Sequence, residues 1–310
     1  MPVAVAQYLH AGLNVEQALF RRRQQIVAPH EIAGNSLRVS ARKQTTGLER
    51  LGNEVDQFAC VHQRGMCSRA QVRDSLVSVA RQVEIMNHLY ARTLLSLVVL
   101  ALVMGLLLFG AAGSIRYWQG WVYLAIFTTA SLLTSLYLLR RDPALLKRRL
   151  SGGPTAEKET SQKIIMLFAS IGFTAVLVVP ALDHRFGWST VPLSVAIGGD
   201  ILIAIGFYFI FLVYKENTFA SATIEVAENQ RVISSGPYAL LRHPMYASAW
   251  LYLVGTPLSL ASYWGLLALA FMLPFLIWRL IDEEKFLARN LPGYTEYQKR
   301  VRYRLVPHVW

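Results

Sequence analysis

Cysteine and charge are both scarce in this chain of 310 residues. Its two cysteines, Cys60 and Cys67, lie in the N-terminal region, so the rest of the chain has no disulfide framework, thiolate metal site or cysteine nucleophile. Charged residues make up 16% of the sequence, against about 25% in a typical soluble domain. The shortage is concentrated in several apolar runs long enough to cross about 30 Å of hydrocarbon. The composition therefore predicts a polytopic integral membrane protein.

Acidic residues are also few, and 19 Asp and Glu against 31 Lys and Arg give a formal net charge of +12. The basic residues cluster in short loops beside the apolar runs, which is the pattern of the positive-inside rule and of attraction to anionic headgroups. The sequence has no RNA-binding signature and no interleaving of aromatic and basic residues on a polar face. We therefore expect membrane lipid as the partner of these charges, with no nucleic acid and no metal.

Residues 1–85 differ from the rest because they are polar and contain no apolar run long enough to span a membrane. They also lack the charged n-region, apolar h-region and cleavage site of a secretory signal. We predict that they form a poorly ordered basic extension. The sequence from Met86 onward has the character of a membrane-protein start. An alternative is therefore that residues 1–85 are not part of the functional protein.

Six apolar runs follow, and they predict an all-α fold, because only helices or closed barrels satisfy backbone groups in lipid. The predicted spans are about Thr93–Ala112, Trp118–Leu139, Ile164–Leu182, Val191–Tyr214, Met245–Leu260 and Tyr263–Ile281. The first four belong to a transmembrane region, residues 86–214. The last two form a tight helical hairpin in a C-terminal region, residues 215–310. Both helices of this hairpin are near the lower length limit for a membrane span.

The basic loops predict the orientation of these helices. Residues 140–163 carry seven Lys and Arg against three acids, so we expect this loop in the cytoplasm. The loop at 215–244 then lies on the same side, as do both termini. The connections near Arg116, Asp183–Arg185 and Ser262 are expected outside.

Most polar residues of the last third of the chain fall within about 80 positions, on the predicted cytoplasmic side. They are Asn217, Glu225, Tyr238, Arg242, His243, Tyr246, Arg279, Asp282, Glu283, Glu284, Tyr294 and Tyr297. Because the hairpin starts and ends in the cytoplasm, His243–Tyr246 at its entrance should face Arg279–Glu284 at its exit. Pro244 favours an extended His243 and then opens a helix, whose free N–H groups can receive a carboxylate or phosphate. These features predict a binding site at the membrane surface.

Several of these acids have a plainer interpretation. Arg279 and Glu283 are four residues apart on one helical face, and such a pair can simply anchor a helix end. Asp282 is the acid of its group that we expect to be merely solvated. Asp200 lies inside a predicted span, where an acid is costly, and we expect it to form a structural hydrogen bond to a neighbouring helix.

The C-terminal pattern resembles a known family. "GPYALLRHPMY" at 236–246, the apolar hairpin and "RLIDEEKFLARNLPGYTEYQKRV" at 279–301 are similar to the isoprenylcysteine carboxyl methyltransferases, and the phospholipid N-methyltransferases share this pattern. The resemblance covers about residues 215–305. "LDHRFGWS" and "ENTFASATIEV" resemble bacterial members, which implies a bacterial inner membrane. Residues 1–85 have no counterpart in the family.

The resemblance implies methyl transfer from S-adenosylmethionine at a cytoplasmic pocket. The cofactor-binding positions that it implies are Gln230, Val232, Ile233, Tyr238, His243, Pro244, Met245 and Tyr246, with Glu284 helping to close the pocket. Arg279 and Glu283 match the catalytic positions that orient the acceptor. Members of the family commonly have Gly shortly after the last motif tyrosine, whereas this chain has Ala247 and Ser248.

The acceptor remains open between two chemistries. A carboxylate acceptor is already ionised and could be fixed by Arg279, with Glu283 holding the guanidinium, and this favours carboxyl O-methylation of an isoprenylcysteine-like or other lipidic molecule. An amine acceptor must first lose a proton, for which Glu283 or Glu284 could act as base, as in phospholipid N-methylation. An NADPH-dependent membrane reductase is a weaker alternative. A transporter is a further one, although it would place polar residues at mid-membrane.

Overall fold

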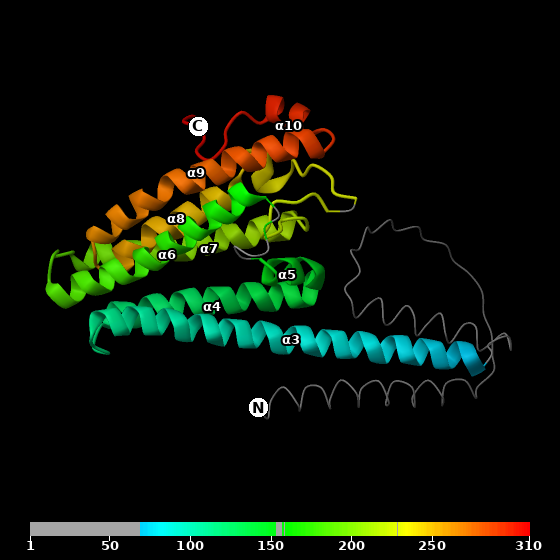
Figure 1. Ribbon diagram of the computed structural model, residues 1–310, viewed down its shortest axis with the longest axis horizontal. Coiled ribbons are helices and arrows are strands. Elements are labelled where there is room, and N and C mark those ends of the chain that lie inside the picture. Colours follow the sequence, from blue (N-terminus) through cyan, green and yellow to red (C-terminus); the bar gives the residue numbers. More distant parts are fainter. Residues whose placement is uncertain (1–68, 153–156, 158, 228) are drawn as a thin grey trace, which may run out of the picture. The chain divides into compact units, whose positions relative to one another are not determined.

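The computed structural model describes residues 69–152, 157, 159–227 and 229–310, all within one compact unit. These residues form helices joined by loops, with no strand among them, which confirms the predicted all-α class (Figure 1). The helices are α3 (Arg69–Ala112), α4 (Trp118–Arg141), α5 (Pro143–Leu150), α6 (Thr160–Phe186), α7 (Leu193–Glu216), the 3₁₀ helix η1 (Gly236–Ala239), α8 (Pro244–Ser259), α9 (Trp264–Asn290) and α10 (Tyr294–Arg300).

Within the described part of the chain, five helices are long and apolar enough to cross a membrane. They are α4, α6, α7, α9 and the Ala80–Ala112 part of α3. The fifth predicted span, Met245–Leu260, corresponds to α8, which has only 16 residues, fewer than the roughly 20 that cross 30 Å. In contrast, α9 has 27 residues and continues beyond the predicted end at Ile281. The protein is therefore an integral membrane protein whose C-terminal hairpin has one short and one long helix.

The start of α3 differs from the predicted boundary at residue 85. The helix begins at Arg69, so the last part of the predicted extension is helical. Residues 69–104 contain neither proline nor glycine, and nothing in this segment interrupts a helix. Residues 1–68, with Cys60 and Cys67, lie outside the described residues.

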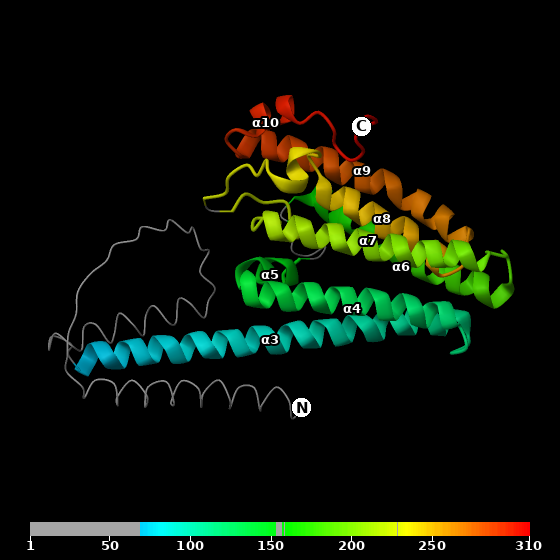
Figure 2. The same cartoon turned by 180° about the vertical axis from the view of Figure 1, so that it is seen from behind.

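The helices α7 and α8 make the most extensive contact between two elements and lie side by side (Figure 2). A Cβ atom added to Gly199 would lie 2.2 Å from the backbone nitrogen of Ser259, and one added to Gly206 would lie 2.8 Å from that of Tyr252. On α8, a Cβ atom added to Gly255 would lie 2.7 Å from the carbonyl oxygen of Gly199. Small residues thus bring the two backbones into contact, as in other helix pairs in membranes.

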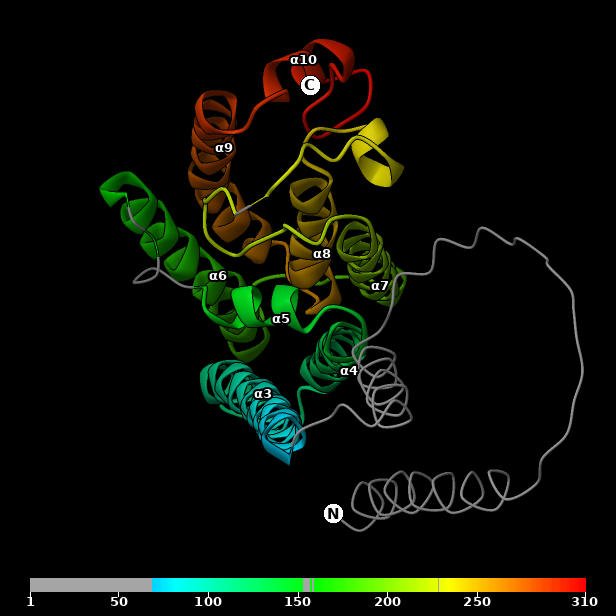
Figure 3. The same cartoon turned by 90° about the vertical axis from the view of Figure 1, so that its right-hand side faces the viewer.

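Seen along the helices, α8 lies between α7 and α9, with α6 beyond (Figure 3). Its C-terminal end is held by two acids. Asp200 on α7 accepts a hydrogen bond from the Ser259 hydroxyl, which confirms the predicted structural role of this acid. Asp183 at the end of α6 is 1% exposed and accepts hydrogen bonds from the Ser189 backbone N–H and the Ser262 hydroxyl. These bonds fix the α8–α9 turn to the neighbouring helices.

The segment before α8 has a backbone that its sequence explains. Gly236 has φ = 56°, a left-handed value that glycine adopts readily, and it leads into η1. His243 is the N-cap of α8 and Pro244 is its first residue, as the fixed φ of proline favours at a helix start.

The C-terminal segment holds this part of the chain in place. The backbone N–H groups of Arg242 and His243 donate to the carbonyl oxygens of Tyr303 and Arg304, at 2.9 and 3.0 Å. On α10, the hydroxyl of Tyr297 lies 2.8 Å from the carbonyl oxygen of Tyr238 and 3.2 Å from that of Leu241. Residues 236–243 are therefore clamped between the hairpin and the C-terminal segment.

Gly199→Ala should destabilise the protein, whereas Gly198→Ala should not. The added methyl group at 199 meets the backbone of α8, while nothing lies within 4 Å of a Cβ atom at the adjacent Gly198. Overpacking of this kind costs about 1–3 kcal/mol. Thermal unfolding of the two variants in the same detergent measures the difference, and equal unfolding temperatures would contradict the close contact between α7 and α8.

Tyr297→Phe should loosen residues 238–243, because two carbonyl oxygens lose their hydroxyl donor at a cost of about 1–3 kcal/mol. The control is Tyr303→Phe, since the Tyr303 hydroxyl lies 3.0 Å from Nδ1 of the exposed His308 and not beside the clamped segment. Hydrogen exchange measured by mass spectrometry should show faster exchange at 238–243 in Tyr297→Phe than in the control. The same exchange in both variants would show that the Tyr297 hydroxyl does not clamp this segment.

Candidate functional site

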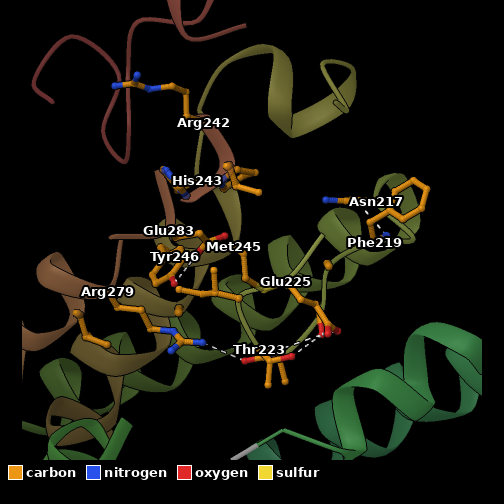
Figure 4. A pocket seen from close by; sticks show the side chains of 18 of the residues that line it. Asn217, Phe219, Thr223, Glu225, Arg242, His243, Met245, Tyr246, Arg279 and Glu283 are labelled. Atoms are coloured by element: carbon orange, nitrogen blue, oxygen red, sulfur yellow. Dashed lines mark hydrogen bonds between the residues drawn. The ribbon is translucent and has the colours of Figure 1, made fainter. Parts of the chain in front are cut away.

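A cavity of about 600 Å³ lies at the N-terminal end of α8, between α6, α8, α9 and the segment 217–246. All the site residues predicted from sequence line it, apart from Glu284. These are Gln230, Val232, Ile233, Tyr238, His243, Pro244, Met245, Tyr246, Arg279 and Glu283. Residues that lie up to 53 positions apart in sequence, from Gln230 to Glu283, therefore meet around one space (Figure 4).

The entrance and the exit of the hairpin meet at a short hydrogen bond. The Tyr246 hydroxyl on α8 donates to Oε2 of Glu283 on α9, at 2.6 Å. The ring of His243 packs edge-on against that of Tyr246, with 5.6 Å between their centroids. The predicted convergence of these residues is thus present in the structure, and Figure 4 shows Tyr246 and Glu283 pointing toward each other.

Arg279 does not have the partner expected from sequence. Its Nη1 donates to Oε1 of Gln162 at 2.8 Å, and its Nη2 donates to Oε1 of Glu157 at 2.8 Å and to the carbonyl oxygen of Ala222 at 3.0 Å. Glu283 therefore makes no direct hydrogen bond to the guanidinium, although its charge acts on Arg279. A carboxylate and an amide from outside α9 occupy that position instead, while Glu283 binds Tyr246.

The neighbouring Asp282 is not merely solvated, as the sequence suggested. Its Oδ2 accepts hydrogen bonds from the Gln162 side-chain amide and, at 3.4 Å, from the Ser161 hydroxyl. Sequence reasoning missed Glu157 and Gln162, although they lie in the polar loop predicted on the same side of the membrane as the site. Their predicted position on the same side of the membrane was the one feature of the sequence that could have linked them to the site.

Glu284, which the resemblance implies helps to close the pocket, lies outside the cavity lining and forms ion pairs behind it. Its Oε1 lies 3.1 Å from Nε of Arg242 and 3.2 Å from Nε2 of His243, and its Oε2 lies 2.9 Å from Nε of Arg304. Arg242 accordingly points toward the C-terminal segment in Figure 4. Since Nε2 of His243 already faces Glu284, at most Nδ1 and the ring face of this histidine are available to a ligand. Glu284 thus holds the wall of the cavity in place through these contacts.

The loop after α7 forms another wall. The Asn217 side chain donates to the Tyr238 hydroxyl at 2.8 Å and accepts from the Phe219 backbone N–H at 2.9 Å. Burial raises the pKa of Tyr238, so its hydroxyl stays protonated at neutral pH. Further along, the Ser221 hydroxyl donates to Oε1 of Glu225 at 3.0 Å. The loop therefore presents a neutral phenol and a carboxylate to the cavity.

Ala247 and Ser248, where the resemblance leads one to expect glycine, do not line the cavity. Ser248 is buried, and its carbonyl oxygen lies 2.9 Å from where a Cβ atom of Gly206 would be. At this level, Gly206 on α7 is the glycine that allows the backbones of α7 and α8 to approach closely.

Residues 194–292, which run from α7 to just past α9, match the model of a family described as phospholipid methyltransferase. The cobalt-zinc-cadmium resistance protein CzcN of Cupriavidus metallidurans is 32% identical over 104 residues, which are 32% of this chain and 47% of that protein. The chain thus spans about half the length of this curated relative. The matched residues 194–292 contain both halves of the hairpin that bounds the cavity.

Proposed function

We propose that the protein methylates a lipidic acceptor in the membrane, with S-adenosylmethionine as the donor and an amine as the acceptor group. The supporting observation is that a single cavity joins polar motif residues of the family-matched segment to an apolar wall inside the bundle. That wall comes from α6, α8 and α9 and includes Phe173, Trp250, Leu253, Met272 and Leu276. A polar end joined to an apolar wall suits an amphiphile whose headgroup reacts while its chain stays among the helices.

The residues present fit the proposed donor. A cavity of about 600 Å³ is within the usual range of roughly 300–1,000 Å³ for small-molecule sites. Tyr238 and Tyr246 provide aromatic rings for a sulfonium or an adenine, and Val232, Ile233 and Met245 provide an apolar surface. When bound, S-adenosylmethionine supplies an activated methyl group, and the transfer then depends mainly on alignment and the exclusion of water.

The charges around the cavity favour an amine over the carboxylate preferred from sequence. That preference rested on Arg279, whose charge is balanced by Glu157 at 2.8 Å. Among the described residues, Glu225 and Glu283 form no ion pair and accept hydrogen bonds only from the hydroxyl groups of Ser221 and Tyr246. Glu283 lies in the field of Arg279, but Glu157 and Glu283 together outnumber that one cation, so this end of the cavity favours a positively charged acceptor over an anionic one.

Glu283 is the proposed base for this amine. It lines the cavity, and the bond from Tyr246 fixes its Oε2 at 2.6 Å. A carboxylate held in this way can take a proton from an ammonium headgroup before the methyl group is transferred. Tyr246 keeps the carboxylate oriented toward the acceptor.

The purified protein should bind S-adenosylmethionine saturably and transfer its labelled methyl group to phosphatidylethanolamine in vesicles. The same assay should use N-acetyl-S-farnesylcysteine as a lipidic carboxylate, with products identified by mass spectrometry. Transfer to the farnesylcysteine alone would show that the acceptor group is a carboxylate and not an amine. Absence of saturable binding, or tighter binding of NADPH, would overturn the methyltransferase proposal.

Glu283→Gln should lower kcat on the amine lipid by about 10²-fold or more, because general-base catalysis contributes roughly 10²–10⁴-fold. The Kd of S-adenosylmethionine, measured by isothermal titration, should stay within about twofold of the wild type. Glu296→Gln is a matched control, since Glu296 lies on the exposed face of α10. Wild-type turnover in Glu283→Gln would rule out this base.

A further inference from the structure

The guanidinium of Arg279 joins three segments that are far apart in sequence. It projects from α9 and binds Gln162 in the first turn of α6, Glu157 just before that helix, and the Ala222 carbonyl oxygen after α7. Three of the five N–H groups of an arginine are used by these bonds, so at most two remain for a ligand. The orientation of the cation is therefore set by protein groups before any acceptor enters.

Glu157 is placed specifically for this contact. It is 4% exposed, its Oε1 lies 2.8 Å from Nη2 of Arg279, and its Oε2 accepts from the Ile224 backbone N–H at 3.4 Å. A buried carboxylate persists only with a cation and hydrogen-bond donors beside it. By contrast Glu159, two residues later, is exposed and makes no side-chain capping bond. Burial is thus a property of Glu157 and not of the acidic residues in this loop generally.

Gln162 completes the arrangement. It is 2% exposed, its amide oxygen accepts from Arg279 at 2.8 Å, and its amide nitrogen donates to Asp282. The two partners demand opposite ends of the amide, so its orientation is fixed. Because Arg279 and Asp282 are both on α9, Gln162 also fixes the rotation of that helix relative to α6.

We propose that Glu157 and Gln162 are positioning residues that hold Arg279 and, through it, place the turn of α9 carrying Glu283 at the acceptor. Both lie outside residues 194–292, so a part of the chain beyond the family-matched segment would control the acceptor half of the site. This inference rests on the proposed methyl transfer. It assigns Glu157 no contact with the donor, since Glu157 is absent from the cavity lining, and it predicts an effect on turnover without an effect on donor binding.

Glu157→Gln should lower kcat on phosphatidylethanolamine vesicles by about 10- to 100-fold, the loss expected when a positioned group moves by about 1 Å. The Kd of S-adenosylmethionine should stay within twofold of the wild type, and the Glu159→Gln control should match the wild type in both. Gln162→Met should also lower kcat, and each variant serves as the replacement if the other folds poorly. A parallel loss of donor binding and turnover, or turnover within twofold of the wild type in both variants, would overturn the proposal.

A double-mutant cycle tests whether Glu157 acts through Arg279. With Arg279→Gln already present, adding Glu157→Gln should change kcat by less than twofold, because the group to be positioned is gone. Losses that multiply would show that Glu157 acts independently. If the wild type transfers methyl to neither lipid, the proposed function fails. The unfolding temperatures of the wild type, the two single variants and the double variant then test the contact between Glu157 and Arg279. Changes in unfolding temperature that are not additive support the positioning of Arg279, and additive changes reject it.

Discussion

The site depends first on the buried carboxylate of Glu284. One side chain on α9 lies within 3.2 Å of Arg242, His243 and Arg304, and so it joins the end of the hairpin, its beginning and the C-terminal segment. Arg242 and Arg304 offset the cost of burying this carboxylate, and His243 adds a third polar contact to it. Residues 236–243 can therefore hold one conformation although they contain little regular structure.

The packing of the helices places the candidate site residues within this framework. Glycines on α7 bring it against α8, which in turn lies between α7 and α9. With the backbone of α8 held in this way, Tyr246 at its start meets Glu283 on α9 at 2.6 Å. The 27-residue length of α9 matters equally, because it keeps Arg279 and Glu283 within a rigid helix instead of a frayed end.

The sequence was informative where a short pattern implies a local geometry. The apolar runs predicted the helices, and the hairpin topology brought His243, Tyr246 and Glu283 together because its two ends must meet. It did not reveal Glu157 as the partner of Arg279, since the two are 122 positions apart and their contact depends on how α6 packs against α9. The start of α3 and the end of α9 were misjudged for another reason: hydropathy reports where lipid contact ends, and these helices continue beyond it.

The short α8 also bears on the energetics of reaching a lipid. Its 16 residues rise about 24 Å, roughly 6 Å less than the hydrocarbon core, and its C-terminal end is tied to Asp200 through Ser259. If that tied end lies at one boundary of the hydrocarbon, the N-terminal end with Tyr246 stops short of the opposite boundary. In such a geometry, the lipidic acceptor proposed above would reach the cavity without being lifted into water, which costs about 0.8 kcal/mol for each CH₂ group withdrawn. A short helix in the hairpin would then spare the enzyme the work of extracting its substrate from the membrane.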